Sequence, residues 1–193
     1  MSGLPRSQTT PEEYLAWDLT HAGKHEFVNG EMWAMAGAHP AHNLLTVNLT
    51  ATLAPKLRGH GCRALSADQR VQVEETGLYC YPDLTVVCGP LSLAPTQPPT
   101  LLNPTLIAEV LSPSTAAFDK DVKFAHYRRR ASVMAILFVS WPERRVELYT
   151  RDGDGWRLTE ARGNEVLPVA TLGITLPLEE IYGGVEELLA AST

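Results

Sequence analysis

One apolar run, Thr105 to Leu111, constrains the fold of this chain more than any other segment. Its only charged residue is Glu109, which stands between Ala108 and Val110. A near-continuous apolar run is typical of a strand that is covered on both faces. An unpaired carboxylate in such surroundings costs several kcal/mol, so Glu109 needs a cation or must give up its charge. The sequence therefore predicts a buried central strand that carries an unusual group.

Local signals predict the elements of the N-terminal third. Thr10 to Glu13 combine a capping hydroxyl, a proline at the first helical position and a glutamate that can close a capping box, so we expect a helix that ends before His21. Asn29-Gly30 predicts a β-hairpin of His25 to Val28 and Glu31 to Met35, because both turn residues accept positive φ. A helix is expected over residues 40–57, with Pro40 in its first turn.

The remaining elements alternate between strands and helices, which favours an α/β class with a mixed α+β sheet. Helices pack against the sheet, and the N-terminal helix and hairpin lie beside it. We expect a flexible N-terminus over residues 1–10 and a single domain over residues 11–193. The other predicted elements are strands at Ala64–Val73 and Leu84–Cys88, an exposed proline-rich loop at Pro90–Pro104, a helix at Phe118–Arg130, a hairpin of Met134–Ser140 and Val146–Thr150 with a Pro142-Glu143 turn, a turn at Asp152–Gly155 and a short helix from about Leu178.

The formal net charge of -6 argues against a protein that coats nucleic acid with its whole surface. Phosphate contacts would have to be local, and the best candidate is the basic run from Lys120 to Arg130. A solvated helix face is the alternative interpretation of that run.

The cysteines and the hydropathy predict where in the cell the protein is located. Cys62, Cys80 and Cys88 are odd in number and share no metal-binding spacing, so we expect buried reduced thiols in a cytoplasmic protein. No apolar stretch reaches the roughly 20 residues that a membrane span needs, so no membrane association is expected.

Two acids occupy positions where acids are energetically expensive. Asp83 follows Pro82 at the start of a predicted strand, and Glu109 lies inside the apolar run. A divalent ion would resolve this conflict, because Mg²⁺ and Mn²⁺ prefer oxygen ligands. Such an ion lowers the pKa of a bound water and stabilises charge on a phosphoryl group, which are the requirements of phosphodiester hydrolysis. Lys123 lies on roughly one helical face with Asp119 and Tyr127 and is the candidate for orienting the attacking water.

Each of these residues also has a structural interpretation. Asp83 can cap backbone amides, Glu109 can form an ion pair with Lys123 or Arg128, and Lys123 alone would be a surface residue. Glu26 can be a cross-strand partner on an exposed hairpin. The sequence lacks a glycine-rich phosphate loop and a nucleophile elbow, and no histidine pair has a third ligand at the spacing of a zinc site.

Several motifs together resemble the bacterial putative restriction endonuclease family of the PD-(D/E)XK nuclease superfamily. The resemblance covers roughly Pro11 to Ile181. The segments that carry it are Tyr81-Pro82-Asp83, then Glu109 to Thr115, then Asp119 with Lys123 and Tyr127, and the opening segment Glu26 to Glu31 with the later His42.

The resemblance implies a restriction-endonuclease-like fold in which Asp83 and Glu109 hold the metal and Glu26 assists. The superfamily usually places its lysine two residues after the second acid, but that position is Leu111 here, which makes Lys123 the candidate. His42 and Tyr127 are candidates for contacting substrate. Many relatives carry an Asp near the end of the strand that reads Phe138 to Trp141 here, and a Gly at Arg130-Ala131.

The expected activity is that of a metal-dependent endonuclease that hydrolyses DNA and acts as a homodimer. The alternative is a catalytically impaired module with the same fold that binds DNA or a protein partner. A third hypothesis is a metal-dependent hydrolase of small phosphoesters.

Overall fold

The computed structural model describes residues 3–4, 9–35, 37–141 and 143–190, and its centre is a six-stranded mixed sheet. The strand β10 pairs in parallel with β11, and every other neighbouring pair in this sheet is antiparallel. In spatial order the strands are β13 (Gly155–Arg162), β12 (Arg145–Asp152), β11 (Ala135–Ser140), β10 (Leu106–Leu111), β7 (Leu84–Cys88) and β4 (Cys62–Ser66).

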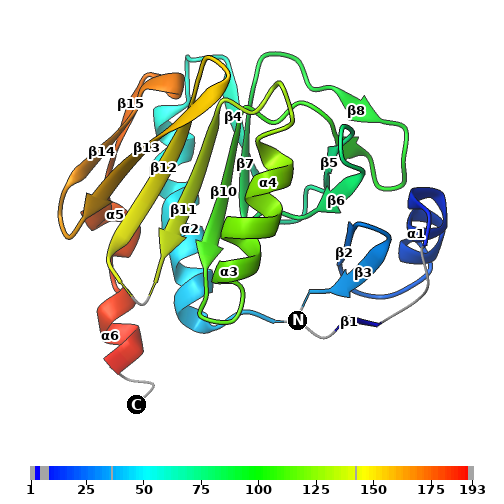
Figure 1. Ribbon diagram of the computed structural model, residues 1–193. Helices are drawn as coiled ribbons and strands as arrows, with labels where there is room; N and C mark the ends of the chain where they lie inside the picture. Colours follow the sequence, from blue (N-terminus) through cyan, green and yellow to red (C-terminus); the bar gives the residue numbers. More distant parts are fainter. Residues whose placement is uncertain (1–2, 5–8, 36, 142, 191–193) are drawn as a thin grey trace.

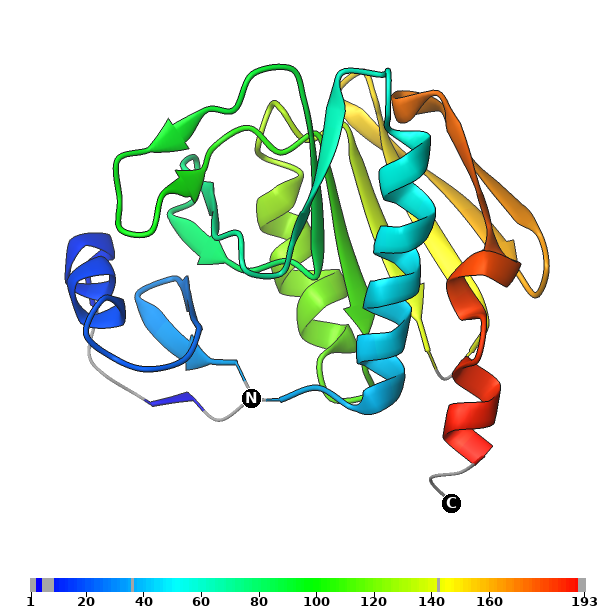
Figure 2. The same ribbon diagram turned by 180° about the vertical axis from the view of Figure 1, so that it is seen from behind.

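Helices cover both faces of this sheet (Figures 1 and 2). One face packs against α2 (Pro40–Lys56), and the other against a continuous helical segment made of α3 (Ala116–Phe118), a π-helical turn (Asp119–Lys123) and α4 (Phe124–Tyr127). All residues of β10 are buried, and they alternate between the two cores. The prediction of a buried central strand is confirmed.

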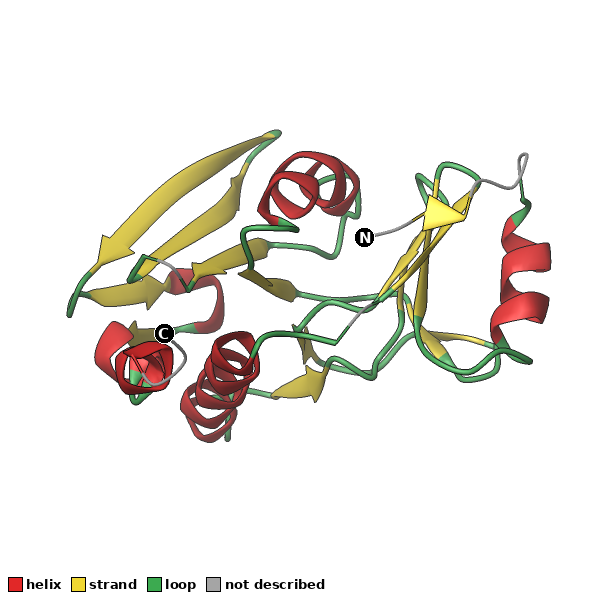
Figure 3. Cartoon of the chain, turned by 90° about the horizontal axis from the view of Figure 1, so that it is seen from below, coloured by secondary structure: helices red, strands yellow, loops and turns green. Residues whose placement is uncertain are grey.

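A second sheet of seven short strands lies beside the first, with α1 (Pro11–Asp18) on its outer side (Figure 3). The helix packs through Tyr14 onto Phe27 and Tyr79. The strands of this sheet are β1 (Gly3–Leu4), β3 (Glu31–Ala34), β2 (His25–Val28), β6 (Leu78–Cys80), β5 (Val71–Val73), β9 (Thr100–Leu101) and β8 (Leu93–Ala94).

The C-terminal part closes the core against α2. It comprises a hairpin of β14 (Val166–Val169) and β15 (Ile174–Pro177) around a 3-10 turn (Ala170–Leu172), followed by α5 (Leu178–Tyr182) and α6 (Val185–Ala190). We expected one short helix here. The structure has two, and Gly184 between them has a positive φ of 74° that a continuous helix does not allow.

Several local predictions are confirmed. Thr10 and Glu13 form the capping box of α1, and Asn29 and Gly30 adopt φ of 51° and 84° in the hairpin turn. The predicted helix after Pro40 and the hairpin of β11 and β12 are present. Within the predicted turn of that hairpin, Pro142 lies outside the described residues.

Other predictions were wrong in detail. The single strand expected at residues 64–73 is two strands in different sheets, because the chain turns after Ser66. The proline-rich loop contributes β8 and β9, and Thr100 and Leu101 are fully buried. The helix expected from Phe118 begins at Ala116 and ends at Tyr127, before its arginines.

The flexible N-terminus expected over residues 1–10 stays a prediction. Gly3 and Leu4 pair with β3, and the Thr9 amide donates a hydrogen bond to the Gly30 carbonyl. Residues 1–2 and 5–8 of that segment lie outside the described part of the chain. The single domain over residues 11–193 stays a prediction.

The cysteine prediction was wrong for two of three residues. The register of β4 and β7 places Cys62 directly opposite Cys88, and the two form a disulfide. Cys80 is free and buried, as expected. Reduced thiols were one reason to expect a cytoplasmic protein, and two of the three cysteines no longer support it. The cytoplasmic location stays a prediction. Among the helices of the described ranges, none is long and apolar enough to cross a membrane.

Candidate active site

A cavity of about 480 Å³ opens at the end of the parallel strand pair β10–β11. Its walls come from both large sheets, because β2 contributes Glu26 and β10 contributes Glu109. The N-terminal turns of α2, the corner between β6 and β7, and the π-helical turn complete the lining. Residues far apart in the sequence therefore line one half-open cavity.

The cavity brings together four of the residues that the sequence singled out. The ammonium nitrogen of Lys123 lies 2.9 Å from Glu26 Oε1 and 3.3 Å from Glu109 Oε1. Asp83 lies beside them, because its amide donates a 3.4 Å hydrogen bond to Glu109 Oε2. Glu26, Glu109 and Lys123 are at most 5% exposed. The surface-residue interpretation of Lys123 and the exposed-hairpin interpretation of Glu26 are therefore wrong.

Asp119 is a member of this cluster to which the sequence analysis gave no role. Its Oδ1 lies 3.3 Å from Lys123 Nζ, and both residues belong to the π-helical turn. Such turns occur as short insertions in helices and are frequent at functional sites. The i,i+4 spacing of Asp119 and Lys123 was the available signal, but that spacing is equally common on solvated helix faces.

Backbone amides hold the carboxylates in place. The Val110 amide donates to Asp83 Oδ2 at 2.7 Å, and the Tyr81 amide donates to Glu26 Oε1 at 3.2 Å. Nε2 of His42 lies 3.2 Å from the same Asp83 oxygen, so this predicted residue also lies in the site. Hydrogen bonds from these amides stabilise the ionised carboxylates.

Tyr127 lies beneath the cavity and does not line it. Its side chain is fully buried, and its hydroxyl donates to Glu109 Oε1 at 2.5 Å. We expected a residue that contacts substrate, but this position supports the carboxylate from below. A direct substrate contact by Tyr127 is therefore not part of our proposal.

Burial and charge shift the proton affinities of the cluster. Burial raises the pKa of Glu109 well above its ordinary value; Lys123 opposes this rise, and the neighbouring carboxylates add to it. Burial raises the pKa of Asp119 as well. For Lys123 burial alone would lower the pKa, but the carboxylates of Glu109, Glu26 and Asp119 raise it well above its usual range. The lysine is therefore a permanent cation at neutral pH.

His42 is subject to opposing effects. Burial lowers the pKa of His42, whereas the hydrogen bond to Asp83 and the charge of Asp83 raise it. The two raising effects together outweigh burial, so the pKa lies above the usual 6.5. The second ring nitrogen, Nδ1, is buried and has no hydrogen-bond partner among the described residues.

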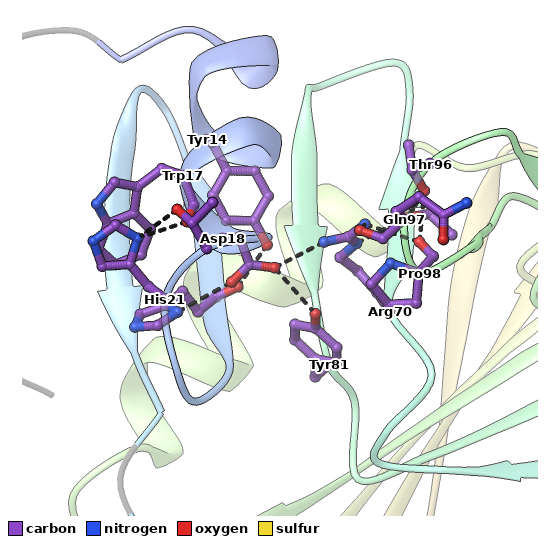
Figure 4. A network of polar contacts seen from close by, with 12 residues as sticks. Tyr14, Trp17, Asp18, His21, Arg70, Tyr81, Thr96, Gln97 and Pro98 are labelled. Carbon is purple, nitrogen blue, oxygen red and sulfur yellow. Dashed lines mark hydrogen bonds and ion pairs between the residues drawn. The ribbon is translucent and has the colours of Figure 1, made fainter.

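A buried arginine network supports the site from the side of the second sheet (Figure 4). Arg70 is fully buried, and its Nη1 donates to Asp18 Oδ2 at 2.8 Å. Its Nε donates to the Thr100 hydroxyl at 2.8 Å, and its Nη2 donates to the Pro98 carbonyl at 3.0 Å. The Tyr81 hydroxyl donates to the same Asp18 oxygen at 3.5 Å. The network thus connects α1 and the proline-rich loop to the residue whose amide holds Glu26.

Two aromatic side chains complete the cavity. The rings of His39 and Trp141 stack with their centroids 4.9 Å apart and their planes 5° from parallel. The strand end where the resemblance suggests an aspartate carries Ser140 and Trp141 in this chain. Sequence reasoning did not select either ring, because a helix-capping histidine and a strand-end tryptophan are ordinary structural residues.

The residue types in the cavity fit a hard divalent cation. Four carboxylates converge on one lysine and one histidine, which leaves an excess of negative charge in a buried space. Oxygen ligands of this kind suit Mg²⁺ and Mn²⁺. No three His, Cys, Asp or Glu side chains in the described ranges already surround a common metal position, because Glu26, Glu109 and Asp119 are turned toward Lys123.

Comparison with known proteins identifies the family of this chain. The model of the Uma2 family, described as putative restriction endonuclease, matches residues 11–179. This chain belongs to that family. The resemblance drawn from the sequence motifs is thereby confirmed, and Uma2 membership places the chain among nuclease-like proteins.

Relatives of this Uma2 chain include two proteins of Synechocystis sp. The uncharacterized protein slr1290 is 32% identical over 181 residues, which cover 93% of this chain and 94% of the relative. The uncharacterized protein sll1609 is 37% identical over 155 residues, which cover 80% and 88%. A crystal structure from Anabaena variabilis, of a putative nuclease belonging to DUF820, has a TM-score of 0.71 at 13% identity and covers 91% of this chain and 98% of its own. The expected fold class is confirmed.

Proposed function

We propose that this Uma2 protein is a metal-dependent endonuclease that hydrolyses DNA phosphodiester bonds. The observation that carries the proposal is the convergence of Glu26, Asp83, Glu109 and Lys123 in one cavity. Family membership supports the nuclease class. Asp83 and Glu109 would hold Mg²⁺ or Mn²⁺, with Glu26 as the assisting acid. The bound ion would supply Lewis acidity toward the phosphate and a lowered pKa of a coordinated water.

The residues of the chain constrain how such a hydrolysis would proceed. Water attacks phosphorus, the bond from phosphorus to the leaving oxygen breaks, and the proton of the water needs an acceptor. Lys123 cannot accept it, because its raised pKa keeps it protonated. Its ammonium can instead orient the water and offset the negative charge that develops on the phosphate. The carboxylates of the cluster are the candidates for accepting this proton, and the leaving oxygen takes up a proton in turn.

A cleavage panel with matched variants tests this proposal. Supercoiled plasmid and oligonucleotides are incubated with Mg²⁺, Mn²⁺ or chelator. We expect cleavage only with metal, and Glu109→Gln is expected to reduce the rate by roughly a thousandfold, because it removes a charged ligand while keeping the shape of the side chain.

Glu147→Gln is the control for that variant. Glu147 is also a buried acid, 5% exposed, but it belongs to β12 and pairs with Lys120 outside the cavity. It should leave cleavage unchanged. Unaltered cleavage by Glu109→Gln, or cleavage that persists in chelator, would contradict the proposed roles.

A second candidate is a non-catalytic module with the same fold that binds DNA or a protein partner. The position of Lys123 favours it, because the ammonium is surrounded by the carboxylates that would otherwise face a metal ion. Calorimetry with Mn²⁺ separates the two candidates: a nuclease binds the ion and loses that binding on Asp83→Asn, whereas a non-catalytic module binds none.

The homodimer remains a prediction. It rests on the resemblance, because duplex cutting by the PD-(D/E)XK superfamily often needs two active sites, and light scattering would measure it. Hydrolysis of small phosphoesters, the third hypothesis, would show as cleavage of nucleotides but not of polymer.

A further inference from the structure

Part of the cavity is lined by groups that hydrolysis does not require. Nδ1 of His39 accepts a hydrogen bond from the Ala41 amide at 3.1 Å, so the ring is fixed as the cap of α2. Trp141 lies parallel to that ring, and the Asn43 side chain also belongs to the lining. The pair of His39 and Trp141, which we call the aromatic pair, is therefore a preorganised stack of two parallel rings at the cavity, and a base can extend this stack only over an outer ring face.

The chemistry of this lining suits an unpaired nucleobase. Aromatic faces bind bases by stacking, which requires no particular base sequence. Only a base that has left its partner and its neighbours exposes a free face to a protein ring.

The burial of Glu109 and Lys123 also favours an unpaired nucleotide as the ligand. Glu109 and Lys123 are only 3% and 5% exposed, so the scissile phosphate must enter the cavity to reach them. A space of about 480 Å³ is in the range of small-ligand sites and accommodates a nucleotide, but not a duplex. A single strand can place one nucleotide in such a pocket, whereas a duplex must first be unpaired and unstacked there.

The charge distribution does not favour duplex binding. Within the basic run, Lys120 lies 2.7 Å from Glu147, Lys123 lies inside the acidic cluster, and Arg130 lies 2.6 Å from Glu74. Binding of duplex DNA through its phosphates depends on free lysine and arginine. Arg128 and Arg129 are exposed, but three of the five lysines and arginines of the run are engaged and the net charge is -6, so stacking becomes the more important source of affinity.

We propose that this site takes single-stranded DNA, with one unpaired nucleotide in the cavity and its base stacked on the aromatic pair of His39 and Trp141. The proposal rests on the proposed nuclease function and narrows its substrate class. A single strand also needs only one active site for its cleavage.

Binding without cleavage tests the proposal. The affinity of the full chain is measured by fluorescence anisotropy in chelator, at a physiological salt concentration. The probes are an oligothymidylate of about 12 nucleotides, the same length with abasic sites, the corresponding duplex, and thymidine monophosphate as competitor. We expect the single strand to bind at least about tenfold more tightly than the duplex or the abasic strand.

Variants locate the binding. Trp141→Ala and His39→Ala should each weaken single-strand binding by about tenfold, whereas Trp141→Phe should restore most of it because the ring is kept. Trp156→Ala is the control. This tryptophan lies on β13, packs against Arg151 and Phe124, and does not line the cavity. Thermal unfolding confirms that each variant is folded, and the rescue by Trp141→Phe separates loss of stacking from loss of structure.

The outcomes separate this inference from the proposed function. Equal or tighter binding of the duplex, no effect of Trp141→Ala and His39→Ala, or no competition by the monophosphate would overturn the inference. Cleavage of duplex with no preference for single strands would overturn it and leave the nuclease proposal intact. Single-strand binding through the aromatic pair without cleavage under any metal would support it as a binding site and contradict the hydrolytic function.

Discussion

Lys123→Met is expected to destabilise the protein by about 3 to 5 kcal/mol at neutral pH and to abolish cleavage. The substitution keeps the length of the side chain but removes the cation that lies within 3.3 Å of Glu26, Glu109 and Asp119. Removal of one partner from a buried ion pair leaves uncompensated charge, which accounts for this magnitude. Urea unfolding measures the loss of stability, and the cleavage panel measures the loss of activity.

The pH dependence of this variant follows from the pKa of Glu109. A carboxyl group whose pKa is higher in the folded than in the unfolded state binds its proton more tightly when folded, so stability falls as the pH rises above the ordinary value of 4.5. Without Lys123 this pKa rises further. We therefore expect the deficit of the variant to be large at neutral pH and to shrink as the pH falls toward 4.5.

Lys120→Met is the control for this prediction. It removes a lysine from the same helical turn, but this side chain is 32% exposed and Glu147 keeps Arg145 as a second partner. Partly exposed pairs of this kind contribute less than about 1 kcal/mol. Equal stability losses in the two lysine variants would show that the acidic cluster does not depend on Lys123.

Arg70→Met is expected to cost about 3 to 5 kcal/mol in the free energy of unfolding, again because a buried charge loses its partner. Asp18, whose side chain is 6% exposed, would remain with His25 and Tyr81 as its polar neighbours. The acceptor carbonyls of Gln97 and Pro98 would also lose their donor. Urea unfolding of the variant and its parent measures the effect.

The double variant Asp18→Asn, Arg70→Met makes this prediction specific. Removal of both charges should cost less than Arg70→Met alone, because no uncompensated carboxylate remains. Arg63→Met, which removes an exposed arginine from β4, should change the stability little. A double variant as unstable as the sum of its single variants would show that Asp18 and Arg70 do not act as a pair.

Sequence alone determined the features that depend on neighbours along the chain. The capping box at Thr10 and the hairpin at Asn29-Gly30 follow from backbone preferences that act over a few residues. The buried strand β10 follows from its apolar run, and so does the need of Glu109 within that run for a cation. These inferences succeeded because each depends on residues that are adjacent in the sequence.

Tertiary structure decided which of these residues meet. Glu26 reaches Lys123 because β2 of the second sheet and the π-helical turn line the same cavity, and Cys62 meets Cys88 because of the register between β4 and β7. The aromatic pair of His39 and Trp141 joins a helix start to a strand end. Register and sheet packing are set by the total burial of apolar surface over the whole chain, and no local pattern encodes that sum.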